Sequence, residues 1–234
     1  REPGELVDDG VAVVGALVRH ALRDRGIWLV GHALTLPGRS VRAVAGRSNM
    51  CTIARMGTPG SFDVRERLAT ICGPGFARDA GPADEVAGVP ARWVAAPGTV
   101  EAAAAVLALA AARDLAVVPR GAATKLDWGV PPARLDLLVD TGRLAGIWHR
   151  DPGELSVEVG AGTPIRAVQA ALGQRGLRLA CDPRSMGATL GGILAADESG
   201  PLRHRYGTPC EQVVGVSYVD ADGRLQHADG WSMR

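Results

Sequence analysis

A short apolar run that ends abruptly in a loop of small residues is the feature that most constrains the fold. Residues 115–118 are continuously apolar and too few for a helix, which predicts a buried strand. Residues 119–125 then read Pro-Arg-Gly-Ala-Ala-Thr-Lys. Small side chains let a ligand approach the backbone, and successive N–H groups there can point at phosphate oxygens. Taken alone, the stretch fits either an anion-binding turn or a plain connection between two elements.

The loop matches neither of two common nucleotide-binding motifs. A Walker A motif has glycine directly before its lysine and Ser or Thr after it, whereas Thr124 precedes Lys125 and Leu126 follows it. The dinucleotide fingerprint G-x-G-x-x-G is also absent from the sequence. The sequence therefore disfavours nucleotide hydrolysis and a Rossmann cofactor site.

Two further glycine-containing segments lie downstream of this loop. Residues 187–192 read GATLGG, and residues 199–207 read SGPLRHRYG. The loop over residues 119–125 and this downstream region thus offer accessible backbone at two places in one domain. This suggests a large phosphorylated ligand that is held at both places. Alone, the first segment also fits the start of a helix or strand, and the second fits a solvated basic turn.

From residue 67 onward, helices and strands are predicted to alternate. Apolar spacing and turn residues predict helices over residues 67–72, 100–113 and 165–175. The same signals predict strands over residues 93–96, 115–118, 135–139, 155–159, 213–219 and 224–227. Thr99 and Thr163 precede two of the helices and are expected to cap them. Asp222 and Gly223 favour a hairpin turn between the last two strands.

Residues 1–66 differ in character and are predicted to form a poorly ordered N-terminal extension of unassigned fold. One helix is expected over residues 11–23, and the basic residues of the segment are interleaved with acids. A solvated surface is favoured over a nucleic-acid-binding arm for that reason.

Composition excludes several classes of protein. With 26 Lys and Arg against 25 Asp and Glu, the net charge is +1, which argues against a nucleic acid partner. The four cysteines form neither a CxxC pair nor a group with histidines, which predicts buried thiols. No apolar run reaches the roughly 18 residues of a membrane span. We therefore expect a cytoplasmic protein without a transmembrane segment.

Five motifs, in this order, resemble the FAD-binding domain of the p-cresol methylhydroxylase and vanillyl-alcohol oxidase type. The motifs are residues 118–129, 139–144, 159–164, 187–192 and 199–207. The likeness is strongest to the flavin subunits of glycolate oxidase and D-lactate dehydrogenase. It implies an α+β fold of two subdomains, incomplete at the C-terminus, with the truncated FAD-binding domain over residues 67–234.

The resemblance also implies how FAD is bound. Residues 120–125 would hold the pyrophosphate through backbone amides, and residues 187–192 would line the isoalloxazine and ribityl side. Relatives with a covalent flavin often carry a histidine in the first loop, where this chain has three small residues, so noncovalent FAD is implied. The implied cofactor-binding residues are Pro119, Arg120, Gly121, Ala122, Ala123, Thr124, Lys125, Gly187, Ala188, Thr189, Gly191, Gly192, Ser199, Gly200, Arg205, Tyr206 and Gly207.

By the same resemblance, the chain would be an oxidoreductase subunit that transfers a hydride from a small 2-hydroxy acid to FAD. Electrons would then pass to a partner, an electron-transfer or iron–sulfur subunit, through which the protein could lie peripherally at a membrane. No catalytic residue is predicted. The alternative is a truncated FAD-binding module without activity of its own.

Three departures from the pattern of relatives stand out. Ala123 occupies a position that is usually glycine, which reduces backbone freedom there. Asp197 and Glu198 replace small uncharged residues, and two carboxylates near a pyrophosphate would repel it unless they turn to solvent. The sequence ends at Arg234, before the segment that completes the domain in relatives and before their substrate-binding cap.

Overall fold

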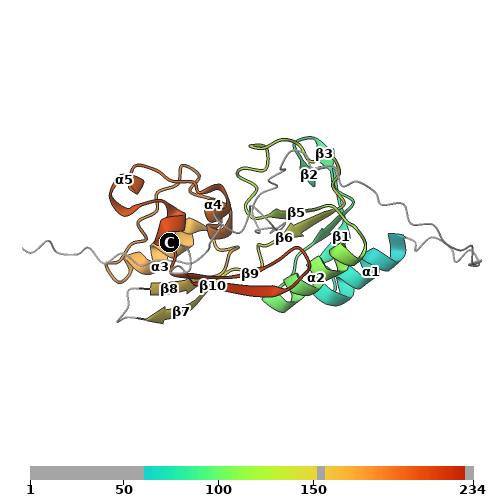
Figure 1. Ribbon diagram of the computed structural model, residues 1–234, viewed down its shortest axis with the longest axis horizontal. Coiled ribbons are helices and arrows are strands. Elements are labelled where there is room, and N and C mark those ends of the chain that lie inside the picture. The colour runs from blue at the N-terminus through green and yellow to red at the C-terminus, as the bar shows by residue number, and fades with distance from the viewer. Residues whose placement is uncertain (1–60, 152–155, 230–234) are drawn as a thin grey trace, which may run out of the picture.

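The computed structural model describes residues 61–151 and 156–229. These residues form two lobes, whose boundary lies between strands β6 (Leu137–Asp140) and β7 (Ile147–Asp151) (Figure 1). Each lobe has its own hydrophobic core. The first begins with helix α1 (Ser61–Cys72) and ends with β6, and the second begins with β7. The helix expected over residues 11–23 lies outside the described residues, as does Cys51.

A four-stranded sheet in the order β1-β4-β6-β5 forms the centre of the first lobe. Strands β4 (Trp93–Ala95), β6 and β5 (Val117–Arg120) run parallel, and β1 (Ala77–Asp79) pairs antiparallel with β4 at one edge. Leu137 and Leu138 are both fully buried. Since consecutive residues of a strand point to opposite faces, both faces of the central strand must be covered.

Two hydrophobic clusters cover those faces. On one face, α1 and α2 (Val100–Ala112) pack on the sheet through residues such as Leu68 and Val106. On the other face, a smaller cluster lies beneath the hairpin of β2 (Glu85–Val86) and β3 (Val89–Pro90). The carboxyl ends of β5 and β6 are thereby fixed by packing on both sides of the sheet.

The second lobe is built on short helices and the antiparallel pair β7–β8. Its further elements are β8 (Ser156–Val159), α3 (Ile165–Gly173), α4 (Leu190–Ala196), α5 (Arg203–Tyr206) and the 3₁₀ helix η1 (Pro209–Gln212). The first turns of α3 and α4 are joined by the hydrogen bond from the Leu190 amide to the Thr163 carbonyl, 2.8 Å long. Ile165 and Ile193, at 0% exposure, lie at the centre of the core between these helices.

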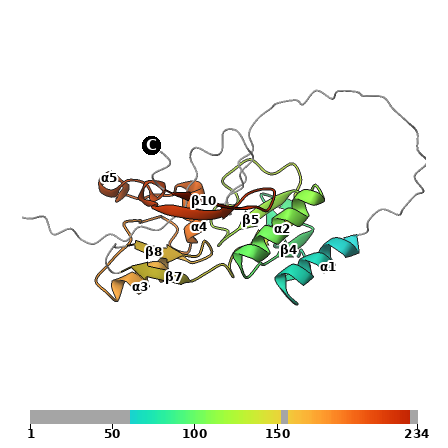
Figure 2. The same cartoon turned by 60° about the horizontal axis from the view of Figure 1, so that its bottom comes forward.

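A hairpin of β9 (Gly215–Val219) and β10 (Leu225–Asp229) connects the lobes and lies along both of them (Figures 1 and 2). Val216 packs against the core of the second lobe, and Val219 is part of the core of the first. The turn of the hairpin contacts α2 closely at Gly223. The hairpin predicted from Asp222 and Gly223 is confirmed, and the tertiary structure adds that its turn docks on a helix.

Other local predictions are confirmed or need correction. Thr99 caps α2 as predicted, because its hydroxyl accepts a hydrogen bond from the Ala102 amide at 3.1 Å. Thr163 does not cap α3: its hydroxyl bonds the backbone of Gly146 instead, and Pro164 is the N-cap without a side-chain bond. Helix α1 starts at Ser61, six residues earlier than expected, and β7 was not predicted.

The described cysteines, Cys72, Cys181 and Cys210, are buried thiols that form no disulfide, as predicted. Burial raises the pKa of Cys181 to about 12, so this thiol stays protonated at neutral pH. Within residues 61–151 and 156–229, no helix is long and apolar enough to cross a membrane.

Candidate functional site

The loop over residues 121–125, hereafter the cradle loop, leaves the carboxyl end of β5 with unpaired backbone donors. No residue of the described segments accepts a hydrogen bond from the N–H groups of residues 121–125. Ala123 adopts a left-handed conformation with φ +57°, as occurs in turns whose successive N–H groups form an anion-binding concavity. Ala122, Ala123 and Thr124 are exposed. The cradle loop thus offers neighbouring amides to a ligand from solvent.

The cradle loop lies against the beginning of α4. Residues 121–126 line a small pocket together with Thr189 and Gly192. Gly121 is in direct contact with the Thr189 side chain, so the first lobe meets the second at this point. The structure therefore brings the first predicted loop together with part of the second, residues 187–192.

Most donors at the start of α4 are already used within the protein. Thr189 is the N-cap, and its hydroxyl accepts from the Gly192 amide at 3.3 Å. The amides of Leu190 and Gly191 donate to the carbonyls of Thr163 and Ala161, each at 2.8 Å. The Ala188 amide donates to the Ser185 carbonyl. This segment gives the pocket its shape, whereas the free donors come from the cradle loop.

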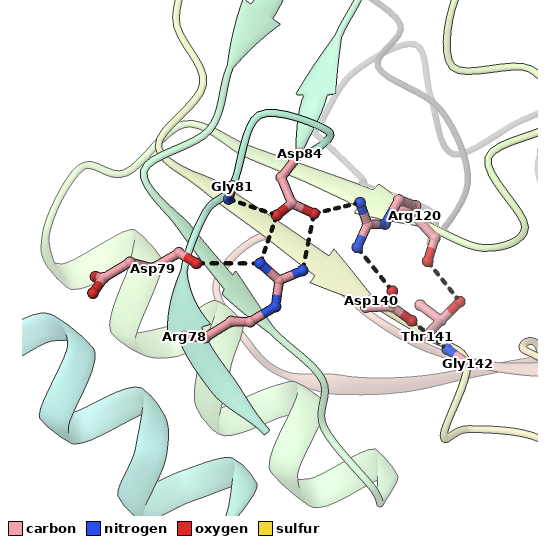
Figure 3. A network of polar contacts seen from close by, with 8 residues as sticks. All are labelled: Arg78, Asp79, Gly81, Asp84, Arg120, Asp140, Thr141 and Gly142. Carbon is pink, nitrogen blue, oxygen red and sulfur yellow. Dashed lines mark hydrogen bonds and ion pairs between the residues drawn. The ribbon is translucent and has the colours of Figure 1, made fainter. Parts of the chain in front are cut away.

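The side chain of Arg120 points away from the cradle loop and lies between two carboxylates (Figure 3). Its Nη1 donates to Asp84 Oδ1 at 2.9 Å, and its Nη2 donates to Asp140 Oδ2 at 3.0 Å. Arg78 also binds Asp84, with hydrogen bonds of 2.6 and 3.0 Å. Chiefly through the bonds from Arg78, the pKa of Asp84 lies well below its usual range.

This network fixes the strand end from which the cradle loop starts. The Arg120 carbonyl accepts from the Thr141 amide at 2.9 Å, which ties β5 to the residue after β6. The two carboxylates neutralise the guanidinium of Arg120, so this side chain has a structural role. Its bonds to Asp84 and Asp140 hold in place the strand end from which the loop starts. Asp84 carried no sequence signal. Asp140 did carry a signal, because it directly follows the strand predicted over residues 135–139 and lies in the motif over residues 139–144.

Lys125 and Glu198 form a buried ion pair at the end of the cradle loop. Their side chains are 3% and 5% exposed. Glu198 does not turn to solvent, which was the condition for it not to repel a pyrophosphate, and the Asp197 carboxylate accepts from the Cys210 amide at 3.3 Å. Lys125 compensates the negative charge of Glu198 within the fold, which the sequence did not indicate.

The third predicted segment, residues 199–207, does not line the pocket of the cradle loop. The amides of Gly200 and Leu202 donate to the carboxylate of Asp182 at 3.1 and 3.2 Å. Arg205 is exposed on α5, which lies farther from β5 than α4 does in both views (Figures 1 and 2). Ser199, Gly200, Arg205, Tyr206 and Gly207 thus do not line this pocket, although Ser199 directly follows Glu198, the ionic partner of Lys125.

Comparison with protein families gives one match that spans both lobes. Residues 91–229 fit the family described as FAD binding domain. The matched segment includes the cradle loop, α4 and the β9–β10 hairpin.

Curated relatives cover a similar part of the chain. D-2-hydroxyglutarate dehydrogenase of Xanthomonas citri pv. viticola is 34% identical over 133 residues, which are 56% of this chain and 28% of the relative. Glycolate oxidase subunit GlcE of Escherichia coli is 34% identical over 91 residues, 38% of this chain and 26% of the relative. The chain thus spans about a quarter of the length of these relatives.

A solved structure shows the same fold. Phl p 4, a grass pollen allergen with glucose dehydrogenase activity, superimposes with a TM-score of 0.60 at 17% identity. The superposition covers 71% of this chain and 38% of the allergen. This likeness confirms the α+β fold expected from the sequence.

Proposed function

The chain belongs to the FAD binding domain family of the p-cresol methylhydroxylase type, and on that premise we propose that the cradle loop holds the FAD pyrophosphate noncovalently. FAD as the cofactor follows from the family and was predicted from the sequence motifs. The observation that carries the proposal is the set of amides over residues 121–125 that have no acceptor among the described residues, three of them in the exposed residues Ala122, Ala123 and Thr124. Such amides are left without partners unless an anion or water binds them.

Amides, rather than cations, are the proposed ligands of the pyrophosphate. Arg120 is neutralised by Asp84 and Asp140, and Lys125 is neutralised by Glu198. Hydrogen bonds from backbone N–H groups to a charged oxygen are shorter and stronger than neutral ones. Pro119, at the end of β5, would place the loop, and Ala122, Ala123 and Thr124 would face the ligand.

The remaining cofactor contacts are proposed from the resemblance and from the position of α4. Thr189 and Gly192 share the pocket with the cradle loop and would contact the part of FAD next to the pyrophosphate. Gly187, Ala188 and Gly191 would line the ribityl and isoalloxazine side. The assignments of Ser199, Gly200, Arg205, Tyr206 and Gly207 stay predictions, as does the extent of the FAD-binding domain over residues 67–234.

We propose the oxidation of a small 2-hydroxy acid as the activity of the whole enzyme. The relatives named for D-2-hydroxyglutarate and glycolate support this substrate class. FAD would accept the hydride from the substrate, while the protein binds and orients both. Since GlcE is named as a subunit, we propose in addition a partner subunit that receives the electrons.

Binding of flavins tests the cradle directly. The protein is titrated with FAD, FMN and riboflavin, and quenching of flavin fluorescence gives each dissociation constant. FMN and riboflavin lack the pyrophosphate, so we expect FAD to bind at least about tenfold more tightly, as for the loss of charge-assisted hydrogen bonds. Equal affinity for the three flavins would contradict the cradle.

Reduction of an electron-accepting dye tests the activity. The FAD-loaded protein is assayed with glycolate, D-lactate and D-2-hydroxyglutarate, and a loss of dye absorbance with any of them supports the oxidoreductase. FAD binding without dye reduction would support the alternative, a binding module that is inactive by itself.

A further inference from the structure

We propose that Lys125 and Glu198 are positioning residues that lock the cradle loop onto the second lobe as an electrically neutral clamp. The inference rests on the proposed function, because the cradle that the clamp positions is the proposed FAD site. Under this proposal the side chain of Lys125 is not a ligand of the pyrophosphate. The clamp also explains how a carboxylate can lie beside an anion-binding loop.

The lysine side of the clamp is anchored in the cradle loop. Lys125 is the last residue of that loop, and its side chain is 3% exposed. Its ammonium group pairs with Glu198 and donates to the Thr124 hydroxyl at 3.2 Å. The ring of Trp128 lies 5.6 Å from the same nitrogen. The charge is thus surrounded by protein groups, and its ionic partner comes from the other lobe.

The glutamate side is held by the end of α4. Asp197, the C-cap, adopts φ +47°, and the Glu198 amide donates to the Ile193 carbonyl at 3.0 Å. The second carboxylate oxygen, Oε1, accepts from the Ser185 amide at 3.1 Å. Ser185 precedes the segment over residues 187–192. One carboxylate therefore joins the cradle loop to the approach of the second predicted FAD-binding segment.

Charge balance prevents Lys125 or Glu198 from leaving its partner to bind a ligand. An ion buried without a partner costs several kcal/mol, so removal of one partner leaves a strongly unfavourable charge. If Lys125 turned to a phosphate, Glu198 would remain buried and unpaired next to two phosphate charges, which repel it. The pair together adds no net charge to the pocket. The amides of the cradle loop can then bind the anion without repulsion from an uncompensated carboxylate.

Four proteins test the clamp: wild type, Lys125→Met, Glu198→Gln and the double variant. We expect Lys125→Met to raise the FAD dissociation constant at least about tenfold, because it leaves an unpaired carboxylate near the pyrophosphate. The double variant is neutral again and should return to within about threefold of wild type. Glu198→Gln should lose stability, because Lys125 is left without its ionic partner. It keeps an acceptor for Ser185 and places no negative charge near the pyrophosphate, so the folded variant should bind FAD at least as tightly as wild type.

The double variant decides between the two roles of Lys125. If Lys125 is itself a phosphate ligand, the double variant will bind FAD as weakly as Lys125→Met does, and the clamp is refuted. Where Lys125→Met alone fails to fold, the double variant is compared with wild type, and a loss of FAD affinity of about tenfold or more in the double variant refutes the clamp. If the charge balance of the clamp had no effect on the cradle, both single variants would weaken FAD binding equally. The neutral clamp predicts the loss in Lys125→Met, where a buried carboxylate is left without its cation near the phosphates.

A readout without FAD separates the clamp from the cradle. Lys125 is the only lysine in the chain, so acetylation by an amine-reactive ester can be followed at one side chain by peptide mass spectrometry. We expect Lys125 of the wild-type protein to react far more slowly than a lysine in an unfolded peptide, and Glu198→Ala to speed the reaction. Fast acetylation of the wild type would refute the clamp. Equal binding of the three flavins would refute only the cradle.

Discussion

Gly121 and Thr189 are in contact across the two lobes, and no side chain fits between them. A β-carbon added to Gly121 would overlap the Thr189 hydroxyl and lie 3.3 Å from both Cβ and Cγ2 of Thr189. Thr189 cannot move away freely, because its hydroxyl caps α4 through the Gly192 amide. Glycine at position 121 is therefore required by the packing of the loop on a helix start.

Gly121→Ala should lower the free energy of unfolding by about 1–3 kcal/mol, as expected for overpacking. It should also weaken FAD binding, since the cradle loop must shift to relieve the overlap. Urea denaturation and flavin titration measure the two effects. Gly187→Ala is the matched control for the effect on stability, because nothing lies within 4 Å of a β-carbon at that position. A similar loss of stability in both variants would argue against the contact as the cause.

Ala123→Gly should stabilise the protein. Ala123 has φ +57°, a conformation that costs a residue with a β-carbon about 1 kcal/mol relative to glycine. Thermal unfolding should therefore show a gain of up to about 1 kcal/mol. Ala122→Gly is the control, because Ala122 is not in the left-handed region, and it should lose stability. An equal loss in both variants would exclude strain at position 123.

Asp84→Asn should cost stability in a pH-dependent manner. The folded-state pKa of Asp84 is depressed, so its contribution is present above the unfolded value of about 3.9 and is lost as the pH falls toward the folded pKa. We expect a loss of about 3 kcal/mol at pH 7, as for a broken buried pair. The difference between wild type and variant should shrink below about pH 4.

Asp79→Asn is the control for this pH series. Asp79 pairs with Arg65 at 3.8 Å, and both side chains are more than half exposed. Its replacement should change the free energy of unfolding by less than about 1 kcal/mol. A constant difference between wild type and Asp84→Asn down to pH 2 would contradict the depressed pKa.

Gly223→Ala should destabilise the protein, because a β-carbon at position 223 would push the turn of the β9–β10 hairpin away from α2. A β-carbon there would lie 2.6 Å from the Ala108 amide nitrogen and 2.7 Å from the Ala108 Cβ, and φ is +81°. Gly176 has a similar φ of +71° with open space around it, so Gly176→Ala measures the strain alone. We expect Gly223→Ala to lose at least about 1 kcal/mol more than Gly176→Ala in urea denaturation. Equal losses would mean that the hairpin does not press on the helix.

Several local elements could be predicted because their signals lie within a few residues. Thr99 before an alanine-rich stretch identified the start of α2, and Asp222-Gly223 identified the hairpin turn. The capping prediction for Thr163 failed because a distant backbone group, at Gly146, competes for the same hydroxyl. Helix α4 was left open, since a glycine-rich start is as compatible with a loop as with a helix.

The sequence by itself determined the order of most elements, the small-residue loop after β5 and the membership of a flavin-binding family. Only the tertiary structure decided which charges meet. Arg120 finds its carboxylates 36 and 20 residues away, and Lys125 finds Glu198 on the other lobe. Backbone preferences act between near neighbours, whereas the partner of a buried charge depends on how sheet, hairpin and lobes pack. For this reason we propose that the loop, which the sequence marks as cationic, binds FAD through its amides and not through its charged side chains.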